Sequence, residues 1–304
     1  VAGEVFGVDG ETRRFLFLGQ TSDELRAAGG FTSSSWILTF RAGMLVDREY
    51  LEVAHFEDLD SLDQYPDAYD ALRLHMDAGS MFLRDAGWDP NFPTVGKLAL
   101  EIYAIGRDVE VDGVISLTQW AFIEFISAMS GLKTDSGVIQ AEDLLSTIEE
   151  GTDREGTIFL STLFDVLIDS MDGETLKANG INVLTSTESL FGSKDLMIYT
   201  QNPEIQSQIV KIGWGGALSN SRGDRLAVVD SNVGWNKVDR NIDRKFSYQV
   251  DLSDVKTPRA KLELEYANLS VIADNICDVQ KHVGGQYEIL LDGCYWNYVR
   301  VYLP

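Results

Sequence analysis

Two apolar runs separated by a short polar segment, within residues 13–40, constrain the fold more than any other feature of the chain. The runs Phe15–Leu18 and Trp36–Phe40 are rich in Phe, Trp, Ile and Leu, which predicts two buried β-strands. The segment between them carries an acid pair, an arginine and two adjacent glycines: Asp23, Glu24, Arg26, Gly29 and Gly30. Such a segment is either a surface turn or a ligand-binding loop at the end of a sheet, where paired glycines and an arginine suit an anion.

Strand and helix signals then alternate along the chain. Strands are predicted at 14–19, 34–41, 44–56 and 112–117, and helices at 66–77, 94–105 and 118–129. Further helices are predicted at 139–150, 153–172 and 202–213, and further β-type runs at 180–186 and 194–201. This order predicts an α/β fold with a mixed sheet flanked by helices.

The pattern changes near residue 235 and becomes two-residue alternation from Lys245 onward. The stretches 245–252, 260–272 and 286–303 alternate apolar and polar residues, which is typical of antiparallel strands with one solvated face. We therefore expect an α/β domain at 1–240 and a small antiparallel β module at 241–304.

Composition excludes several classes of partner. The chain has 304 residues, 44% of them hydrophobic and 24% charged, with a net charge of −23. This charge repels nucleic acid and anionic membrane surfaces, so no nucleic-acid partner is expected. No apolar run approaches the roughly 18 residues that a membrane-spanning helix needs, so membrane attachment is expected only through a removed anchor.

The only two cysteines are Cys277 and Cys294, within alternating apolar segments. They predict a cross-strand disulfide in an exported protein, or else two buried thiols in a cytosolic one.

Familiar catalytic signatures are missing from the sequence. It has no G-x-S-x-G, no phosphate loop ending in Gly-Lys-Ser/Thr, no H-E-x-x-H and no Cys/His cluster. The three histidines, His55, His75 and His282, are scattered along the chain.

Three further clusters of charged residues remain as candidates. "MFLRDAGWDPNFP" carries Arg84, Asp85, Trp88 and Asp89, a composition typical of a sugar-contacting loop or of a buried Arg–Asp strut. In "GTDREGTIFLSTLFDVL", Asp153 and Arg154 are expected at the start of a long helix, where Asp153 suits a cap and Arg154 favours a nearby anion. "DSNVGWNKVDRNIDRKF" carries Lys237 and Arg240 in an aperiodic stretch, which is either a linker or a ligand-binding loop.

Taken in order, these clusters resemble a family known as domain of unknown function 4012. The matching phrases are "FLFLGQTSDELRAAGGF", "LRDAGWDPNFPT", "VDGVISLTQWAFIEFISAMSG" and "NVGWNKVDRNIDRKFSYQVDL", which extend over roughly residues 13–251. More distantly, the first half is similar to the LytR-CpsA-Psr phosphotransferases. That resemblance implies an extracytoplasmic enzyme that moves a glycopolymer from a polyprenyl pyrophosphate carrier, with arginines that hold the pyrophosphate and aspartates that hold a divalent metal.

On this resemblance Arg26 and Arg154 fall at arginine positions, and Arg84 is a looser match. Two metal aspartates of the phosphotransferases are replaced, by Thr21 and Ala28. The resemblance thus implies an anion-gripping site whose Mg²⁺ is doubtful, with Asp23, Glu24, Glu57 or Asp58 as substitute ligands.

Three functions follow as hypotheses. The first is a cell-envelope glycopolymer transferase that acts outside the cytoplasm on a glycan or polyprenyl-phosphate-linked substrate. The second is a glycoside hydrolase with paired carboxylates, and the third is a non-catalytic envelope protein that binds a glycan or a lipid phosphate. The expected catalytic residues are Asp23, Arg26, Arg84, Asp85 and Arg154. The expected substrate-binding residues are Gln20, Gly29, Gly30, Trp88, Asp89, Lys237 and Arg240.

Overall fold

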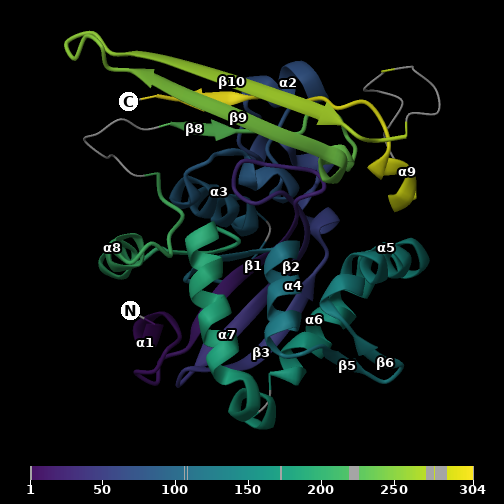
Figure 1. The fold of residues 1–304 in the computed structure, drawn as a ribbon. Helices are drawn as coiled ribbons and strands as arrows, with labels where there is room; N and C mark the ends of the chain where they lie inside the picture. The colour runs from purple at the N-terminus through teal and green to yellow at the C-terminus, as the bar shows by residue number, and fades with distance from the viewer. Residues whose placement is uncertain are drawn as a thin grey trace.

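A five-stranded mixed sheet forms the centre of the protein (Figure 1). The computed structural model describes residues 2–105, 107, 109–171, 173–218, 226–271, 277 and 286–303. The strand order is β3-β2-β1-β4-β7, and only the β1–β4 pair is parallel. The strands are β1 (Arg13–Thr21), β2 (Phe31–Arg41), β3 (Met44–Leu51), β4 (Gly113–Thr118) and β7 (Leu196–Thr200).

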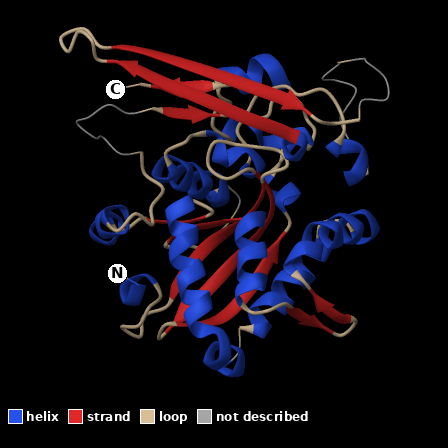
Figure 2. Cartoon of the chain, in the orientation of Figure 1, coloured by secondary structure: helices blue, strands red, loops and turns tan. Residues whose placement is uncertain are grey.

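Strand β1 divides the core into two layers because its side chains alternate between the faces of the sheet. Leu16 and Leu18 point into one apolar cluster, whereas Phe15 and Phe17 point into the other. The first cluster is covered by α3 (Phe92–Ala104), α2 (Asp70–Met76) and the 3-10 turns η1 (Val53–Phe56) and η3 (Leu83–Trp88). Another 3-10 turn, η2 (Leu59–Gln64), has no buried residue. The second is covered by α4 (Gln119–Ala128), α6 (Ile158–Ser170), α7 (Gly173–Ser193) and α8 (Pro203–Lys211). Figure 2 shows these helices against the strands. The predicted mixed sheet flanked by helices is confirmed.

The junction between β4 and α4 shows how local sequence places these layers. Every residue of β4 is buried, which suits a strand with neighbours on both sides. Thr118 ends the strand and accepts a hydrogen bond from the N–H of Ala121 through its hydroxyl, so it also caps α4. The polar ends of β1 and β4 therefore lie beside the first turn of α4.

Several predicted boundaries are wrong. The helix predicted at 139–150 begins only at Leu144, and the helix predicted at 66–77 begins only at Asp70. The predicted helix at 153–172 is split, because α5 (Leu144–Glu155) continues to Glu155 and α6 begins at Ile158. The predicted strand at 44–56 ends at Leu51.

Residues 180–186, predicted as β, lie inside α7, where Val183 packs against the second core cluster. Tertiary packing of the helix therefore overrides the β propensity of this short run.

The C-terminal part contains small antiparallel sheets, as predicted. The long hairpin of β9 (Ile242–Asp251) and β10 (Arg259–Asn268) crosses the top of Figure 1. A second sheet pairs β8 (Ala227–Val229) with β11 (Arg300–Tyr302), so it joins chain from both sides of residue 240. The segment that follows Gln286 was predicted as strand but begins with the short helix α9 (Tyr287–Leu291).

Smaller elements complete the described chain: α1 (Ala2–Val5), β5 (Leu132–Thr134), β6 (Gly137–Ile139), η4 (Ala141–Asp143) and η5 (Val238–Asn241). Cys277 and Cys294 form the predicted disulfide, with Cα atoms 5.5 Å apart. Neither cysteine lies in a strand, so the bond is not cross-strand. Within the described ranges, no helix is long and apolar enough to cross a bilayer.

Candidate functional site

Arg26, the leading candidate for gripping an anion, is fully engaged inside the protein. Its residue is 1% exposed. Nε and Nη2 donate to Oδ1 of Asp85 at 2.9 and 2.6 Å, and Nη2 also donates to Oε1 of Glu24 at 2.9 Å. Nη1 donates to the carbonyls of Leu25 and Asn232, both at 3.0 Å. All five N–H groups of the guanidinium thus have protein acceptors.

The charge of Arg26 is also neutralised internally. Burial by itself would lower the pKa of Arg26, but the adjacent carboxylates of Asp85 and Glu24 raise it overall. Arg26 therefore forms a buried strut between the 22–30 loop and η3, with no donor left for a ligand.

The paired glycines allow the 22–30 loop to fold back closely on β1. Gly29 has a φ of +99°, and a Cβ on Gly30 would lie 2.0 Å from the carbonyl oxygen of Thr21. The carbonyls of Gly29 and Gly30 accept hydrogen bonds from the side chains of Ser22 and Gln20. These contacts explain both glycines as packing requirements.

The second cluster is also held by internal contacts. Arg84 donates to Oε2 of Glu57 at 2.7 Å and lies over the ring of Trp235. Glu57 has a raised pKa because it is partly buried, although Arg84 opposes the shift. Trp88 is buried beneath the guanidinium of Arg300, at 4.7 Å from its ring centroid.

Asp89 closes a local turn within the same cluster. Its Oδ1 accepts a hydrogen bond at 2.7 Å from the N–H of Asn91, immediately before α3.

Arg154, in contrast to Arg26, is an exposed residue. Its side chain is 65% exposed and pairs with the exposed Glu155 in the last turn of α5. The expected helix start was wrong, and a cation near a helix C-terminus needs no external anion. Arg26 and Arg154 therefore do not line one cleft. Asp153 is not a cap of the following helix, since its Oδ1 accepts the N–H of Tyr287 at 2.8 Å.

The structure instead assembles a polar cluster around Asp23, which is 1% exposed. Asp23 Oδ2 accepts a hydrogen bond from the hydroxyl of Tyr287 at 2.7 Å, and Oδ1 accepts one from Gln119 at 2.7 Å. Arg240 forms an ion pair with Asp23 and another with Glu149. Burial and the neighbouring Asp23 carboxylate raise the pKa of Tyr287, so this phenol stays protonated. Asp23 and Arg240, predicted as site residues, are thus brought together.

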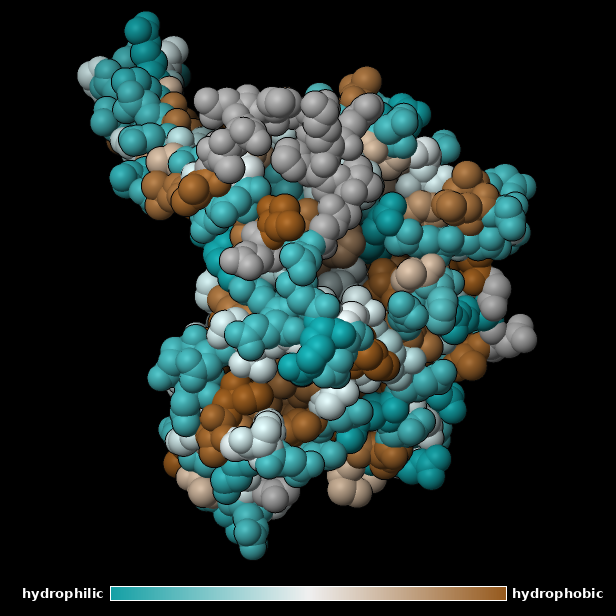
Figure 3. Space-filling model, turned by 90° about the vertical axis from the view of Figure 1, so that its right-hand side faces the viewer, coloured by the Kyte–Doolittle hydropathy of each residue, from teal (hydrophilic) through white to brown (hydrophobic). Residues whose placement is uncertain are grey.

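A cavity of about 220 Å³ opens beside this cluster, between the sheet and helices α4, α5 and α6. Its walls are largely apolar and include Phe17, Trp36, Phe122, Leu163 and Phe164. Figure 3 faces α5 and α6 and shows apolar patches among hydrophilic residues on this side of the molecule.

The polar end of the cavity is lined by Thr21, Gln119, Lys237 and Tyr287, and the predicted Gln20 also lines it. Lys237 is the one charged residue among the described residues of the lining. It is half-buried, and its Nζ lies 5.5 Å from the ring centroid of Phe31 and 4.9 Å from that of Tyr287. Burial lowers the pKa of Lys237, although Glu24 and Asp23 oppose the shift. No carboxylate of the described chain lies within ion-pair distance of it.

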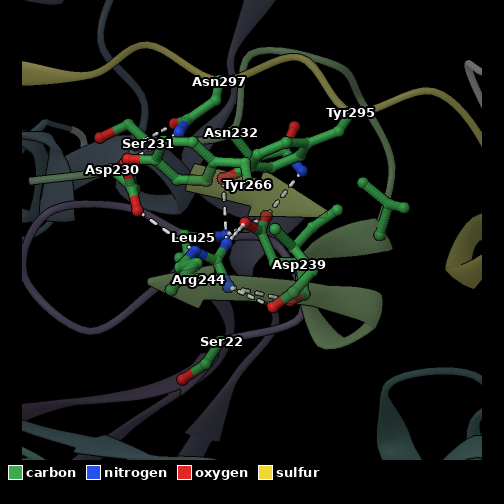
Figure 4. A network of polar contacts seen from close by, with 12 residues as sticks. Ser22, Leu25, Asp230, Ser231, Asn232, Asp239, Arg244, Tyr266, Tyr295 and Asn297 are labelled. Carbon is green, nitrogen blue, oxygen red and sulfur yellow. Dashed lines mark hydrogen bonds and ion pairs between the residues drawn. The ribbon is translucent and has the colours of Figure 1, made fainter. Parts of the chain in front are cut away.

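The segment that carries Lys237 and Arg240 is hydrogen-bonded to the 22–30 loop and holds it in place. Asp239 accepts hydrogen bonds through Oδ2 from the N–H of Leu25 at 3.1 Å and from Asn232 at 2.8 Å. Figure 4 shows Arg244 between Asp230 and Asp239, with which it forms ion pairs. This network positions Lys237 at the cavity.

The residues present do not fit a Mg²⁺ ion held as in the phosphotransferases. Thr21 donates its hydroxyl hydrogen to Gln119 at 2.8 Å, and Ala28 offers no ligand atom. Asp23 and Glu24 are each paired with an arginine. Across the described ranges, no group of three potential ligand residues could hold a metal.

Sequence reasoning found Lys237, Asp23 and Arg240 but missed Tyr287, Gln119 and the aromatic walls. Tyr287 stands in a stretch that alternates like a strand, so no local pattern marked it. His55 is exposed, and His282 lies outside the described residues.

A larger, open groove of about 950 Å³ lies at the opposite end of the sheet. It is lined by residues of both charges and contains none of the predicted site residues.

Comparison with known proteins gives one family and several similar solved structures. Residues 10–152 match the family described as "Protein of unknown function (DUF4012)", and no curated protein matches the chain. Three of the solved structures are the transcriptional regulator yvhJ from Bacillus subtilis, protein gbs0355 from Streptococcus agalactiae and Lin1025 protein from Listeria innocua. Their identities to this chain are 12, 11 and 12%, with TM-scores of 0.38, 0.37 and 0.36. The alignments cover 72, 68 and 93% of this chain and 86, 74 and 99% of those chains. Likeness at this level carries no argument about function.

Proposed function

For a chain whose residues 10–152 match the DUF4012 family, we propose that it binds, outside the cytoplasm, a prenyl lipid phosphate that carries an envelope glycan. The prenyl chain lies in the cavity and the phosphate contacts Lys237. One observation carries the proposal: an apolar cavity of about 220 Å³ whose lining, among described residues, holds a single charge, the ammonium of Lys237.

The energetics of Lys237 favour an anionic ligand. A partly buried ammonium without a carboxylate partner is costly in free energy. The aromatic rings of Phe31 and Tyr287 offset only part of this cost, by about 0.5–2 kcal/mol per cation–π contact. A phosphate at this point supplies the missing counter-charge through charge-assisted hydrogen bonds.

The cavity walls supply the second part of the recognition. Burial of an apolar chain contributes about 0.8 kcal/mol per CH₂. Phe17, Phe122 and Phe164 offer no hydrogen bond to a competing polar ligand. A molecule with an apolar chain and an anionic head therefore matches both ends of the cavity.

Location outside the cytoplasm is consistent with the Cys277–Cys294 disulfide, since such bonds persist in oxidising compartments. The glycan and the carrier come from the resemblance to enzymes that handle polyprenyl-linked glycopolymers. No nucleic acid is expected as a partner because of the net charge of −23.

The test compares farnesyl phosphate, farnesol and inorganic phosphate by calorimetric titration. Farnesyl phosphate should bind most tightly, and Lys237→Met should weaken it about 10- to 100-fold, as expected for a lost charged hydrogen bond. The matched control is Lys261→Met, because Lys261 is an exposed lysine on β10. Equal affinities of the wild type for farnesol and farnesyl phosphate would contradict the proposal.

A glycopolymer transferase remains the second candidate. Its support is Asp23, which is not a lining residue itself but accepts a hydrogen bond from Tyr287, a lining residue at the polar end of the cavity. A carboxylate at this point could accept a proton from an acceptor hydroxyl. Transfer of a labelled glycan from its prenyl carrier to wall polysaccharide should then disappear in Asp23→Asn, while carrier binding persists.

No observation favours the hydrolase. The carboxylates of Asp23, Glu24, Glu57 and Asp85 all accept hydrogen bonds from arginines.

A further inference from the structure

Three aromatic rings close the cavity at the end opposite Lys237. The ring centroids of Phe17 and Trp36 lie 5.5 Å apart, those of Phe17 and Phe164 5.0 Å, and those of Trp36 and Phe164 4.4 Å. Tyr50 packs behind Trp36 at 5.5 Å. All three rings are at most 5% exposed, so this end has no opening past them.

Strand β1 gives the depth of the cavity. Phe17, Gly19 and Thr21 all line it and stand at alternate positions of the strand, so they face the same side. Phe17 lies at the aromatic end and Thr21 at the polar end. Four residue steps at about 3.3 Å each give a depth of about 13 Å.

The cavity volume limits the number of carbon atoms. A protein cavity of about 150 Å³ accommodates benzene, which has six carbons. By proportion, the 220 Å³ of this cavity accommodates about nine carbons. The volume, which is the tighter limit, corresponds to about two isoprene units of five carbons each, and the depth leaves room for the phosphate beside them.

We propose that Phe164, with Phe17 and Trp36, sets the chain length that the site recognises, at two isoprene units counted from the phosphate. This inference rests on the proposed function. Units beyond the second remain outside the cavity and contribute little to affinity. The protein therefore recognises the head and the first two units of a carrier, whatever the total length of the chain.

The test is a series of prenyl phosphates with 5, 10, 15 and 20 carbons, titrated against the wild type. Affinity should rise at least 100-fold from 5 to 10 carbons, from about 0.8 kcal/mol per buried CH₂. From 10 to 20 carbons it should change by less than about threefold, because the added units stay in water. A continued rise to 20 carbons would overturn the inference but leave the proposed function intact. Absence of binding at every length would overturn both.

Two substitutions on α6 and one control identify the residue that sets the limit. Phe164→Ala should move the plateau from 10 to 15 carbons, because removal of the ring extends the cavity. Leu160→Phe adds bulk to the lining and should move the plateau to 5 carbons, and it keeps the inference testable if Phe164→Ala does not fold. Leu167→Ala, at a buried position outside the lining, should leave the plateau at 10. An unchanged plateau in both lining variants would contradict the role of the aromatic end.

Discussion

Arg26 donates two hydrogen bonds to one oxygen of Asp85, through Nε at 2.9 Å and through Nη2 at 2.6 Å. The two residues are 59 positions apart, and their side chains are 0% and 5% exposed. This pair joins the 22–30 loop to η3 beneath the polar end of the sheet. An arginine that appeared suited to an external anion therefore acts as an internal connection.

The first prediction concerns this pair. Asp85→Asn or Arg26→Met should lower the free energy of unfolding by about 3–5 kcal/mol, because either change removes one partner of a buried ion pair and leaves the other charge with only its second partner, Glu24 for Arg26 or Arg84 for Asp85. Arg154→Ala, at an exposed ion pair, should cost less than about 1 kcal/mol. Urea denaturation measures all three. A loss below 1 kcal/mol in both buried variants would show that the strut contributes little to stability.

The second prediction concerns the glycines. Gly30→Ala would place a Cβ 2.0 Å from the backbone oxygen of Thr21, and overpacking against backbone should cost at least about 1–3 kcal/mol. Gly180→Ala is the matched control, since its Cβ meets no atom within 4 Å inside α7. It should stabilise the protein by about 0.5–1 kcal/mol. Thermal unfolding of the two variants should shift in opposite directions.

The third prediction concerns the disulfide. Cys277 and Cys294 are 17 residues apart, and a closed loop of this length stabilises a fold by about 3 kcal/mol. Cys277→Ser with Cys294→Ser should lose about this amount in a urea titration. Reductant should produce the same loss in the wild type and none in the double variant. Two reactive thiols in the unreduced wild type would contradict the pairing.

The fourth prediction concerns alkaline pH. Burial, and then the hydrogen bond to Asp230, raise the pKa of Tyr266 from 10.0 to about 12. Between these values the folded state keeps the phenol proton that the unfolded state loses. The stabilisation from Tyr266 is therefore full below pH 10 and disappears as pH rises to 12.

Denaturation of the wild type and Tyr266→Phe at pH 8 and pH 11.5 measures this effect. The difference in unfolding free energy between the two proteins should shrink at the higher pH. If the difference in unfolding free energy is the same at both pH values, the Tyr266 phenol has the same pKa in the folded and unfolded states.

Local pattern was sufficient for most elements of the α/β core. The apolar run at 15–18 and the Thr118 cap before α4 predicted strand and helix correctly, because alternation and capping act between neighbours in sequence. The same local signals failed at 180–186 and after Gln286, where contacts with distant segments decided between helix and strand. Pairing of the cysteines was predictable because only two exist.

By itself the sequence determined the mixed sheet and its flanking helices, the disulfide partners and the presence of charged residues in the loops. Only the tertiary structure decided which of those charges are neutralised internally and which faces a cavity. Arg26 meets Asp85 across 59 positions, and Asp23 meets Tyr287 across 264, whereas Lys237 meets aromatic rings and, among the described residues, forms no ion pair with an acid. The physical reason is that an ion pair depends on a few ångströms of separation in space, and no periodicity along the chain encodes that distance.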